Sequence, residues 1–175
     1  PALRSRMAKV VRRVARKTML VVGEGDTEVA FLKHLRTLYC ANYEGVAATP
    51  SNAHGKGPTN VIDHTAKQAR NGGYDLKVAL LDTDIPWTDQ LQKLARSRKI
   101  EMVGSTPCIE GLYLQILGRN PPDQSLECKK VIKQLLSCDL TDWENYEQHF
   151  PKDVLQAARG RIAELDRLLG FFEGR

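Results

Sequence analysis

Two apolar runs that each stop at carboxylates constrain the fold of this chain more than any other feature. The letters MLVVGEGDTE occupy residues 19–28, and VALLDTD occupies residues 78–84. Apolar runs of about four to eight residues that end at turn signals are typical of strands buried on both faces of a parallel sheet. The carboxyl ends of neighbouring parallel strands form the crevice where ligands bind. We therefore expect four acids to gather at one edge of such a sheet, namely Glu24, Glu28, Asp82 and Asp84.

Strand and helix patterns alternate through the first two thirds of the chain. Apolar residues between 27 and 39 recur with a period of 3.6, which predicts a helix after the first strand. Further strands are expected at 45–49, 76–81 and 100–104, and further helices from Pro58 to about residue 70, near 87–99 and at 105–117. Such alternation predicts an α/β fold of three layers around a central, mainly parallel four-stranded sheet.

The alternation ends at the segment RNPPD, residues 119–123. Beyond it the patterns are helical, with helices expected at 125–136, 143–149 and 152–169. This last third is too short to be an independent domain. We therefore predict a leader at 1–17, an α/β core at 18–120 and a helical extension at 121–175 that packs on the core.

Basic residues are concentrated at the N-terminus. The formal charge is +5, and seven of the 26 basic residues lie before Thr18 with no acid among them. The remaining 19 basic residues face 21 acidic ones, so the body is close to neutral. A basic leader can neutralise nucleic-acid phosphates, and a solvated leader without a binding role is the alternative. The residues expected to bind nucleic acid here are Arg12, Arg13, Arg16 and Lys17.

Cysteine spacing and hydropathy exclude several classes of protein. The four cysteines form no C-x-x-C pair and have no histidine at zinc-finger spacing, which indicates reduced, buried thiols and a cytoplasmic location. No apolar run approaches the roughly 20 residues that a membrane span requires. We expect no membrane association, and the sequence does not indicate the oligomeric state.

The turn after the first strand does not fit a nucleotide-binding loop. Gly23-Glu24-Gly25 is a G-x-G, but Glu28 stands where the third glycine of G-x-G-x-x-G belongs, and its acids would repel a pyrophosphate. Clustered carboxylates favour Mg²⁺ or Mn²⁺, which prefer oxygen ligands. The alternative is that Asp82 and Asp84 only cap the following helix and that Glu28 is a first-turn acid favoured by the helix dipole.

A second, polar loop precedes the helix that begins at Pro58. Lys56 lies in the segment HGKGP, where backbone N–H groups at the helix start could receive a phosphate. An ordinary flexible loop is the alternative. We include Lys56 among the residues expected to contact nucleic acid.

The two acidic motifs together resemble the Toprim domain of topoisomerases, bacterial primases, and OLD-type and RecR-type proteins. Residues 24–28, EGDTE, have the pattern E-G-x-T-E, which is most similar to OLD nucleases and RloB-like proteins. Residues 105–110, STPCIE, are similar to the S-x-P-C-x-E segment of RloB-like sequences. The resemblance covers residues 19–117. Topoisomerases and primases commonly carry D-x-D-x-x-G, whereas Ile85-Pro86-Trp87 follows the pair here without a glycine, which argues against a primase or strand-passage role.

The resemblance implies a metal-dependent nuclease that acts on DNA or RNA. The resemblance implies that Glu24 is a metal ligand or proton carrier, that Asp82 and Asp84 hold Mg²⁺, and that Glu28 also binds metal. Glu110 would complete a second metal site, with a helix-capping acid as the alternative. Lys152 would neutralise transition-state charge, with a solvated surface lysine as the alternative. The resemblance also implies an ATPase partner. The alternative function is a non-catalytic, nucleic-acid-binding adaptor, either RecR-like or a subunit of a defence system.

Overall fold

A four-stranded parallel sheet forms the centre of the protein. The computed structural model describes residues 15–175. Its strands are β1 (Thr18–Gly23), β2 (Ala47–Asn52), β3 (Leu76–Asp82) and β4 (Glu101–Ser105), in the spatial order β2-β1-β3-β4 with every neighbouring pair parallel. The predicted α/β fold with a four-stranded sheet is therefore confirmed, and it is consistent with a Toprim-like arrangement of three layers.

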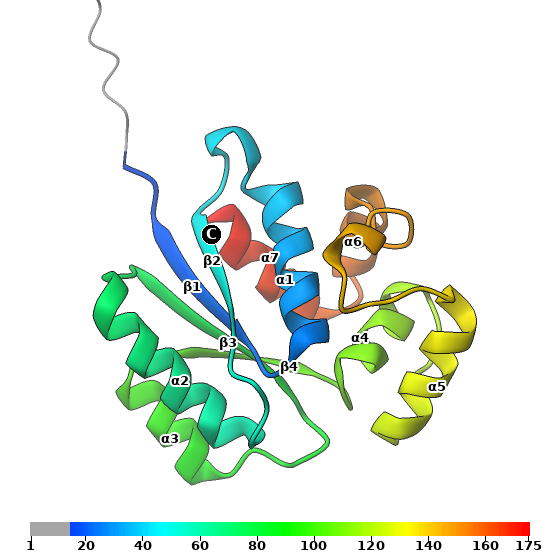
Figure 1. The fold of residues 1–175 in the computed structure, drawn as a ribbon, viewed down its shortest axis with the longest axis horizontal. Coiled ribbons are helices and arrows are strands. Elements are labelled where there is room, and N and C mark those ends of the chain that lie inside the picture. The colour runs from blue at the N-terminus through cyan, green and yellow to red at the C-terminus, as the bar shows by residue number, and fades with distance from the viewer. Residues whose placement is uncertain (1–14) are drawn as a thin grey trace, which may run out of the picture.

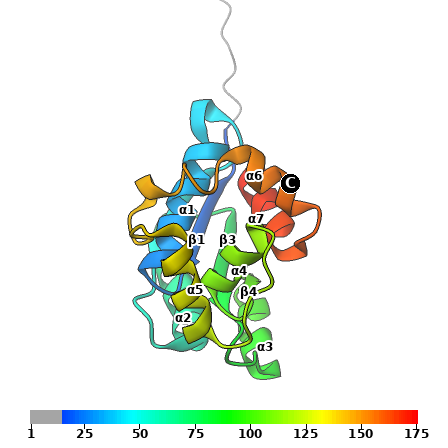
Figure 2. The same ribbon diagram turned by 90° about the vertical axis from the view of Figure 1, so that its right-hand side faces the viewer.

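Helices cover both faces of the sheet (Figure 1). α2 (Gly57–Gly72) and α3 (Asp89–Ser97) cover one face, and α1 (Asp26–Tyr39) packs on the other. α4 (Ile109–Ile116), α6 (Lys152–Arg159) and α7 (Ala163–Glu173) join α1 on its face, and α5 (Ser125–Leu136) packs against α4 (Figure 2). Among these helices none combines the length and the apolarity needed to cross a bilayer.

Two hydrophobic cores separate the layers. The smaller core lies under α2 and α3 and contains Leu20, Val22 and Leu81, whereas Met19, Val21 and Leu80 point into the larger core. Alternate residues of one strand thus enter opposite cores, as strand geometry requires. Because both faces are covered, nearly every residue of β1 and β3 is apolar, which explains the continuous apolar runs in the sequence.

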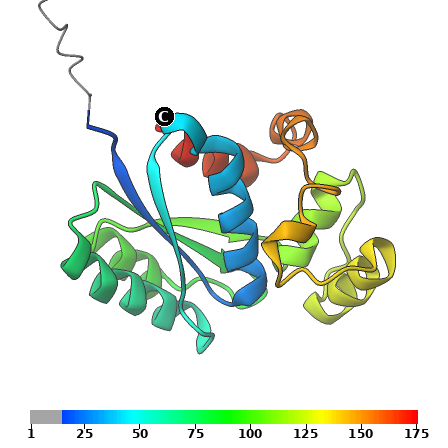
Figure 3. The same ribbon diagram turned by 45° about the horizontal axis from the view of Figure 1, so that its top comes forward.

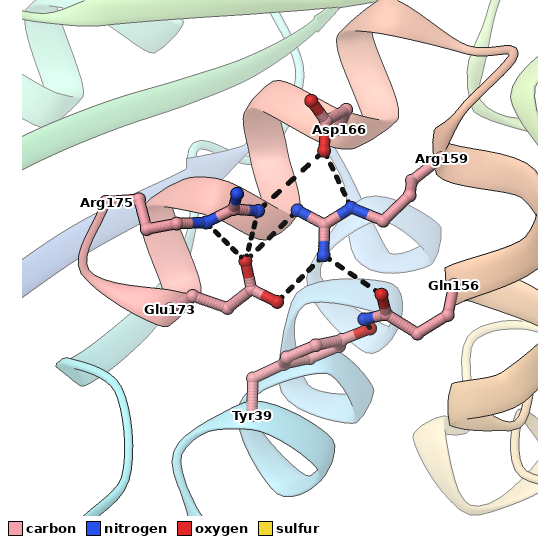
Figure 4. Close-up of polar contacts among 6 residues, drawn as sticks. All are labelled: Tyr39, Gln156, Arg159, Asp166, Glu173 and Arg175. Atoms are coloured by element: carbon pink, nitrogen blue, oxygen red, sulfur yellow. Dashed lines mark hydrogen bonds and ion pairs between the residues drawn. The ribbon is translucent and has the colours of Figure 1, made fainter.

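The helical extension shares the larger core with the α/β part. Residues of α5, α6 and α7 belong to the same buried cluster as residues of α1, β1 and α4. A polar network adds to this contact (Figure 4). In it the Arg159 guanidinium on α6 binds both carboxylate oxygens of Glu173 on α7, at 2.8 and 3.0 Å, and Gln156 donates to the Tyr39 hydroxyl on α1. Asp166 and Arg175 complete the network.

Four elements differ from the sequence-based prediction. The helix expected at 105–117 is α4, which begins at Ile109, because Ser105 is the last residue of β4. β2 occupies 47–52 rather than 45–49 and carries Pro50 in mid-strand, which an edge strand tolerates because one side of it has no hydrogen-bonded neighbour. The helix expected at 152–169 is two helices, since α6 ends at Arg159 and α7 begins at Ala163. The helix expected at 143–149 is a short 3₁₀ turn, η2 (Trp143–Asn145), and a similar turn, η1 (Ala41–Tyr43), follows α1.

Candidate acidic site

The chain reverses its direction of winding between β1 and β3. β1 leads through α1 to β2 on one side, and β3 leads through α3 to β4 on the other. Loops that leave neighbouring strands in opposite directions open a crevice at the carboxyl ends of those strands. A cavity of about 360 Å³ lies there. Five acids line it, namely Glu24, Asp26, Glu28, Asp82 and Glu110, and we call this cavity the acidic site.

Glycine and a capping interaction place Glu28 in the acidic site. Its Oε2 accepts a hydrogen bond from the backbone N–H of Gly25, the N-cap residue of α1, at 3.1 Å, which is the half of a capping box that a glycine N-cap allows. Gly23 allows the approach, because a Cβ there would lie only 2.6 Å from the Glu28 Cβ. Glu28 is 6% exposed, and burial together with Glu110 and Glu24 raises its pKa. The alternative role of Glu28, a first-turn acid of α1, is thus part of what it does.

Asp82 is held at the end of β3 by the last residue of β4 and the first residue of α4. Its Oδ1 accepts hydrogen bonds from the Ser105 hydroxyl at 3.0 Å and from the Ile109 N–H at 3.1 Å. Burial, followed by the charge of Glu28, raises the pKa of Asp82 to about 7, although the Ser105 hydrogen bond opposes the shift. A carboxyl in this state is poised between its two protonation states near neutral pH, which is a frequent property of functional sites.

Glu24 and Asp84 lie nearer to solvent than Glu28. Burial, and to a lesser extent Asp84, raises the pKa of Glu24, whereas the Asp82 backbone and the ammonium of Lys129 lower it. Asp84 is exposed and does not line the cavity, but its Oδ2 accepts a hydrogen bond from the Ser125 hydroxyl of α5 at 2.8 Å. The D-x-D pair is therefore divided, with one acid inside the acidic site and one at its rim.

Glu110 reaches the same cavity from the first turn of α4. It is 8% exposed, and its Oε2 is buried without a hydrogen-bond partner among the described residues. A buried carboxylate oxygen normally has a partner, since an unsatisfied one costs free energy. Gly111 keeps α4 close to the loop before it, because a Cβ there would lie 2.3 Å from the Thr106 carbonyl oxygen.

The donor set of the acidic site suits a hard divalent cation. It consists of carboxylate oxygens, one of them unsatisfied, and the charges repel one another in the absence of a cation. Within residues 15–175, however, no three His, Cys, Asp or Glu side chains stand close enough together to hold one ion as they are placed. The carboxylates therefore fit the chemistry of a divalent cation, but their arrangement does not by itself define a coordination sphere.

The sequence did not single out every residue that lines the cavity, and Asp26, Lys129 and Thr141 are three that it missed. Lys129 on α5 contributes a positive charge near Glu24, and Thr141 lies in the segment before η2. Nothing in the local sequence CKK, residues 128–130, distinguishes Lys129 from a solvated helix lysine. Lys152, predicted to act beside the acids, lies elsewhere: its Nζ is 5.0 Å from the ring centroid of Tyr39, at the far end of α1 from Glu28.

A pair of buried tyrosines lies beneath the first turn of α1, next to the acidic site. The hydroxyls of Tyr113 and Tyr146 are 2.9 Å apart, and the Tyr146 hydroxyl lies 2.7 Å from the Leu140 carbonyl oxygen and 3.2 Å from that of Thr27. Burial raises the pKa of Tyr113 above its ordinary value, so both phenols stay protonated at neutral pH. They hold the first turn of α1, and with it Glu28, against the helical extension.

The residues predicted to bind nucleic acid are dispersed. Arg16 donates to the backbone carbonyls of Cys40, Glu44 and Val46, so its guanidinium is bound to the protein at the end of α1. Lys17 is exposed at the start of β1, and Lys56 is exposed at the start of α2, next to Gly55, which lines the acidic site. Arg12 and Arg13 lie outside the described residues.

Comparison of the chain with protein-family models, with curated proteins and with solved structures gave no match. The argument for function therefore depends on the acidic site itself.

Proposed function

We propose that this protein is a Toprim-type, Mg²⁺- or Mn²⁺-dependent nuclease that hydrolyses phosphodiester bonds of DNA or RNA. The observation that carries the proposal is the meeting of Glu24, Glu28, Asp82 and Glu110 in one cavity at the point where the sheet reverses its winding. A site of this composition repels phosphate unless a cation intervenes, which makes a metal-dependent reaction of a phosphate ester the chemistry it suits best.

Four carboxylates would hold the metal, namely Glu24, Glu28, Asp82 and Glu110, with Asp84 at the rim. When bound, the cation would neutralise phosphate charge and lower the pKa of a water molecule. Lys129 would stabilise negative charge that develops on the phosphate. Glu24, whose pKa is raised, would accept or return a proton at its carboxylate oxygen.

Cleavage assays with the full chain test the proposal. Single- and double-stranded DNA and RNA would be incubated with Mg²⁺ or Mn²⁺, and wild type compared with Glu24→Gln and with Asp89→Asn, a control that removes an exposed acid of α3 away from the site. We expect Glu24→Gln to lower the rate at least 100-fold and Asp89→Asn to leave it unchanged. Equal rates for wild type and Glu24→Gln would overturn the catalytic assignment.

A non-catalytic adaptor is the second candidate, and hydrogen bonding of the acids favours it. Asp82 is held by Ser105 and Ile109, Asp84 by Ser125, and Glu28 by the Gly25 N–H, so each of these acids has a structural role. An adaptor would bind nucleic acid without turnover. The proposal also includes an ATPase partner and a role in a defence system, both of which rest on the resemblance. It includes a cytoplasmic location as well, which rests on the cysteines, all four of which are free.

A further inference from the structure

A groove of about 480 Å³ runs along the outer edge of β4, between that strand and α3. We call it the β4 groove. Its lining includes an aromatic ring and three basic side chains, and the residues that matter for the argument are Trp87, Arg96, Lys99 and Arg167. No part of the function proposed above uses this groove.

One end of the β4 groove adjoins the acidic site. Trp87 follows the D-x-D pair, and its indole N–H donates to the Asp82 backbone carbonyl at 3.1 Å. Its ring lies over β4 at Gly104, where a Cβ would come within 3.2 Å of the ring. The groove extends from there to Lys99, which precedes the first residues of β4. At about 3.3 Å per residue, the strand between Gly104 and Ile100 spans about 13 Å.

The charge of the groove is opposite to that of the acidic site. Arg96 and Lys99 are exposed at the C-terminal end of α3. Arg167 binds the Met102 carbonyl and the Glu101 carboxylate, so it forms a fixed wall rather than a free cation. On the other side of the α3 C-terminus, Arg70, Lys77 and Arg98 line a second hollow of about 260 Å³. Cations therefore gather around this end of α3 although the body of the chain carries no net positive charge.

We propose that the β4 groove binds a single-stranded segment of nucleic acid. In this arrangement Arg96 and Lys99 contact phosphates, and one base stacks on Trp87 next to the acidic site. Trp87 is partly exposed. Cations beside an accessible aromatic ring are the usual means of holding single strands, whereas the bases of a duplex are already stacked on one another. The inference rests on the proposed function, and it adds the strandedness of the substrate and the path by which it enters.

Charge reversal in the groove tests the phosphate contacts. Arg96→Glu/Lys99→Glu would be compared with Lys33→Glu/Arg36→Glu, which changes the same residue types at the same spacing on exposed positions of α1, across the sheet. Binding of labelled single-stranded DNA and RNA would be measured in a Glu24→Gln background with Mg²⁺, so that cleavage does not interfere. We expect the groove variant to bind at least 10-fold more weakly. The slope of log K against log salt concentration should become shallower by about 1.4, which is about 0.7 for each lost phosphate contact to a single strand.

The control variant should retain its affinity within about 2-fold, because its charges face away from the groove. Equal weakening by both double variants would mean that only net charge matters, and no weakening by either would mean that the strand lies elsewhere; each result overturns the proposal. A polyglutamate that binds as tightly as the oligonucleotide would overturn the identification of the ligand as nucleic acid.

Tryptophan fluorescence tests the stacking contact. In a Trp143→Phe background Trp87 is the only tryptophan, because the chain has two. Single-stranded oligonucleotides should quench its emission, and duplexes of the same sequence should not. Trp87→Phe should keep the affinity within about 3-fold, whereas Trp87→Leu should weaken binding about 5- to 150-fold, the range for removal of one base-stacking contact. If a bound single strand does not quench the emission, the stacking contact is refuted, and this result does not depend on a substitution of Trp87.

The outcomes separate this inference from the proposed nuclease. Loss of binding in the groove variant, together with a wild type that never cleaves, would support the groove and refute the nuclease. Cleavage by wild type, with the affinity and KM of the groove variant unchanged, would refute the groove and support the nuclease.

Discussion

Asp82 combines burial, like-charged neighbours and hydrogen bonds that favour its charged form. Its Oδ1 accepts two hydrogen bonds, which stabilise the carboxylate, yet burial and the charges of Glu28, Glu24 and Asp84 outweigh them and raise its pKa from 3.8 to about 7. Most structural aspartates shift the other way, because a cation or several N–H donors compensate for burial. Among the described residues, Asp82 has no neighbouring cation and only one N–H donor to compensate for its burial, and a bound metal cation would supply the missing positive charge.

The shift of Asp82 makes a prediction about stability and pH. A carboxyl whose pKa is higher in the folded state destabilises the protein as pH rises from the unfolded value, near 4, to the folded value, near 7. In metal-free buffer, Asp82→Asn should therefore be more stable than wild type at pH 8, by on the order of 2 kcal/mol after allowance for partial exposure. The difference should shrink toward zero near pH 4.

Urea unfolding at pH 4.5, 6 and 8 in the presence of a chelator measures this difference. Asparagine retains an oxygen that can accept from Ser105 and Ile109, so the substitution tests the charge rather than the hydrogen bonds. A variant that is less stable than wild type at pH 8 would show that Asp82 is stabilised as a carboxylate, contrary to our account.

Gly23 and Gly25 provide a matched pair of substitutions in one turn. A Cβ at Gly23 would lie 2.6 Å from the Glu28 Cβ, whereas one at Gly25 would meet only the Glu28 Oε2, at 3.4 Å. Gly23→Ala should therefore lower the unfolding free energy by about 1–3 kcal/mol. For a chain of this size such a loss lowers the melting temperature by about 3–10 °C. Gly25→Ala should have a clearly smaller effect in the same calorimetric scan, and equal effects would contradict the close packing of β1 against α1.

Side chains of α7 occupy the outer edge of β4. Glu164 accepts a hydrogen bond from the Gly104 N–H at 3.1 Å, and Arg167 donates to the Met102 carbonyl. An edge strand with free backbone groups is a template for pairing with another chain, and charged side chains are a common protection. We predict that Glu164→Ala/Arg167→Ala self-associates with increasing concentration, as measured by sedimentation velocity.

Glu101→Ala is the control for the β4 edge, because it removes the ion pair to Arg167 and leaves the backbone contacts of Arg167 and Glu164 in place. It should sediment as wild type does. A double variant that also sediments unchanged up to high concentration would mean that the helix itself, and not these two side chains, shields the strand.

At the level of elements the sequence predicts the sheet better than it predicts the site. Apolar runs reveal β1 and β3 because both strands are buried on two faces, but β2 is an edge strand whose residues are all half-buried, so its limits were misplaced. The break between α6 and α7 was missed because apolar residues continue in helical register across Gly160. The acids that follow β1 and β3 could be found, since topology alone brings strand ends together.

The basic residues of the site could not be predicted in the same way. Lys129 reaches the acidic site only because α5 packs on α4, a contact between distant parts of the chain that leaves no local pattern. Lys152 was placed by resemblance and lies over Tyr39 instead. Arg16 illustrates a third case, since a residue in a basic run is expected to be solvated, yet three backbone carbonyls near the end of α1 bind its guanidinium.

At the scale of the whole molecule, the helical extension and the α/β core act as one unit. The larger core mixes residues of both, and the end of α7 lies beside the start of β2, where the Val46 N–H donates to the Phe172 carbonyl (Figure 3). Gly45 makes this approach possible, because it has φ +57° and a Cβ there would lie 2.2 Å from the Phe172 oxygen. We therefore expect the two parts to unfold together.

Two single-tryptophan variants test this cooperativity. Trp143→Phe leaves Trp87 to report on the α/β part, and Trp87→Phe leaves Trp143 to report on the extension. In urea each remaining tryptophan should report the same midpoint as the far-ultraviolet circular dichroism of the same variant, as a two-state transition requires. An extension that unfolds at a lower urea concentration than the rest of its own variant would show that it is a separate unit.

The central claim is that the acidic site binds a divalent cation through its carboxylates, Glu110 among them. Titration calorimetry of the full chain with Mn²⁺ tests it most directly, with Glu110→Gln as the variant and Asp89→Asn as the control. We predict that wild type and Asp89→Asn bind Mn²⁺ with the same affinity and that Glu110→Gln binds at least 10-fold more weakly, because its buried oxygen no longer carries charge. Absence of Mn²⁺ binding to wild type, or equal affinity in Glu110→Gln, would contradict the account.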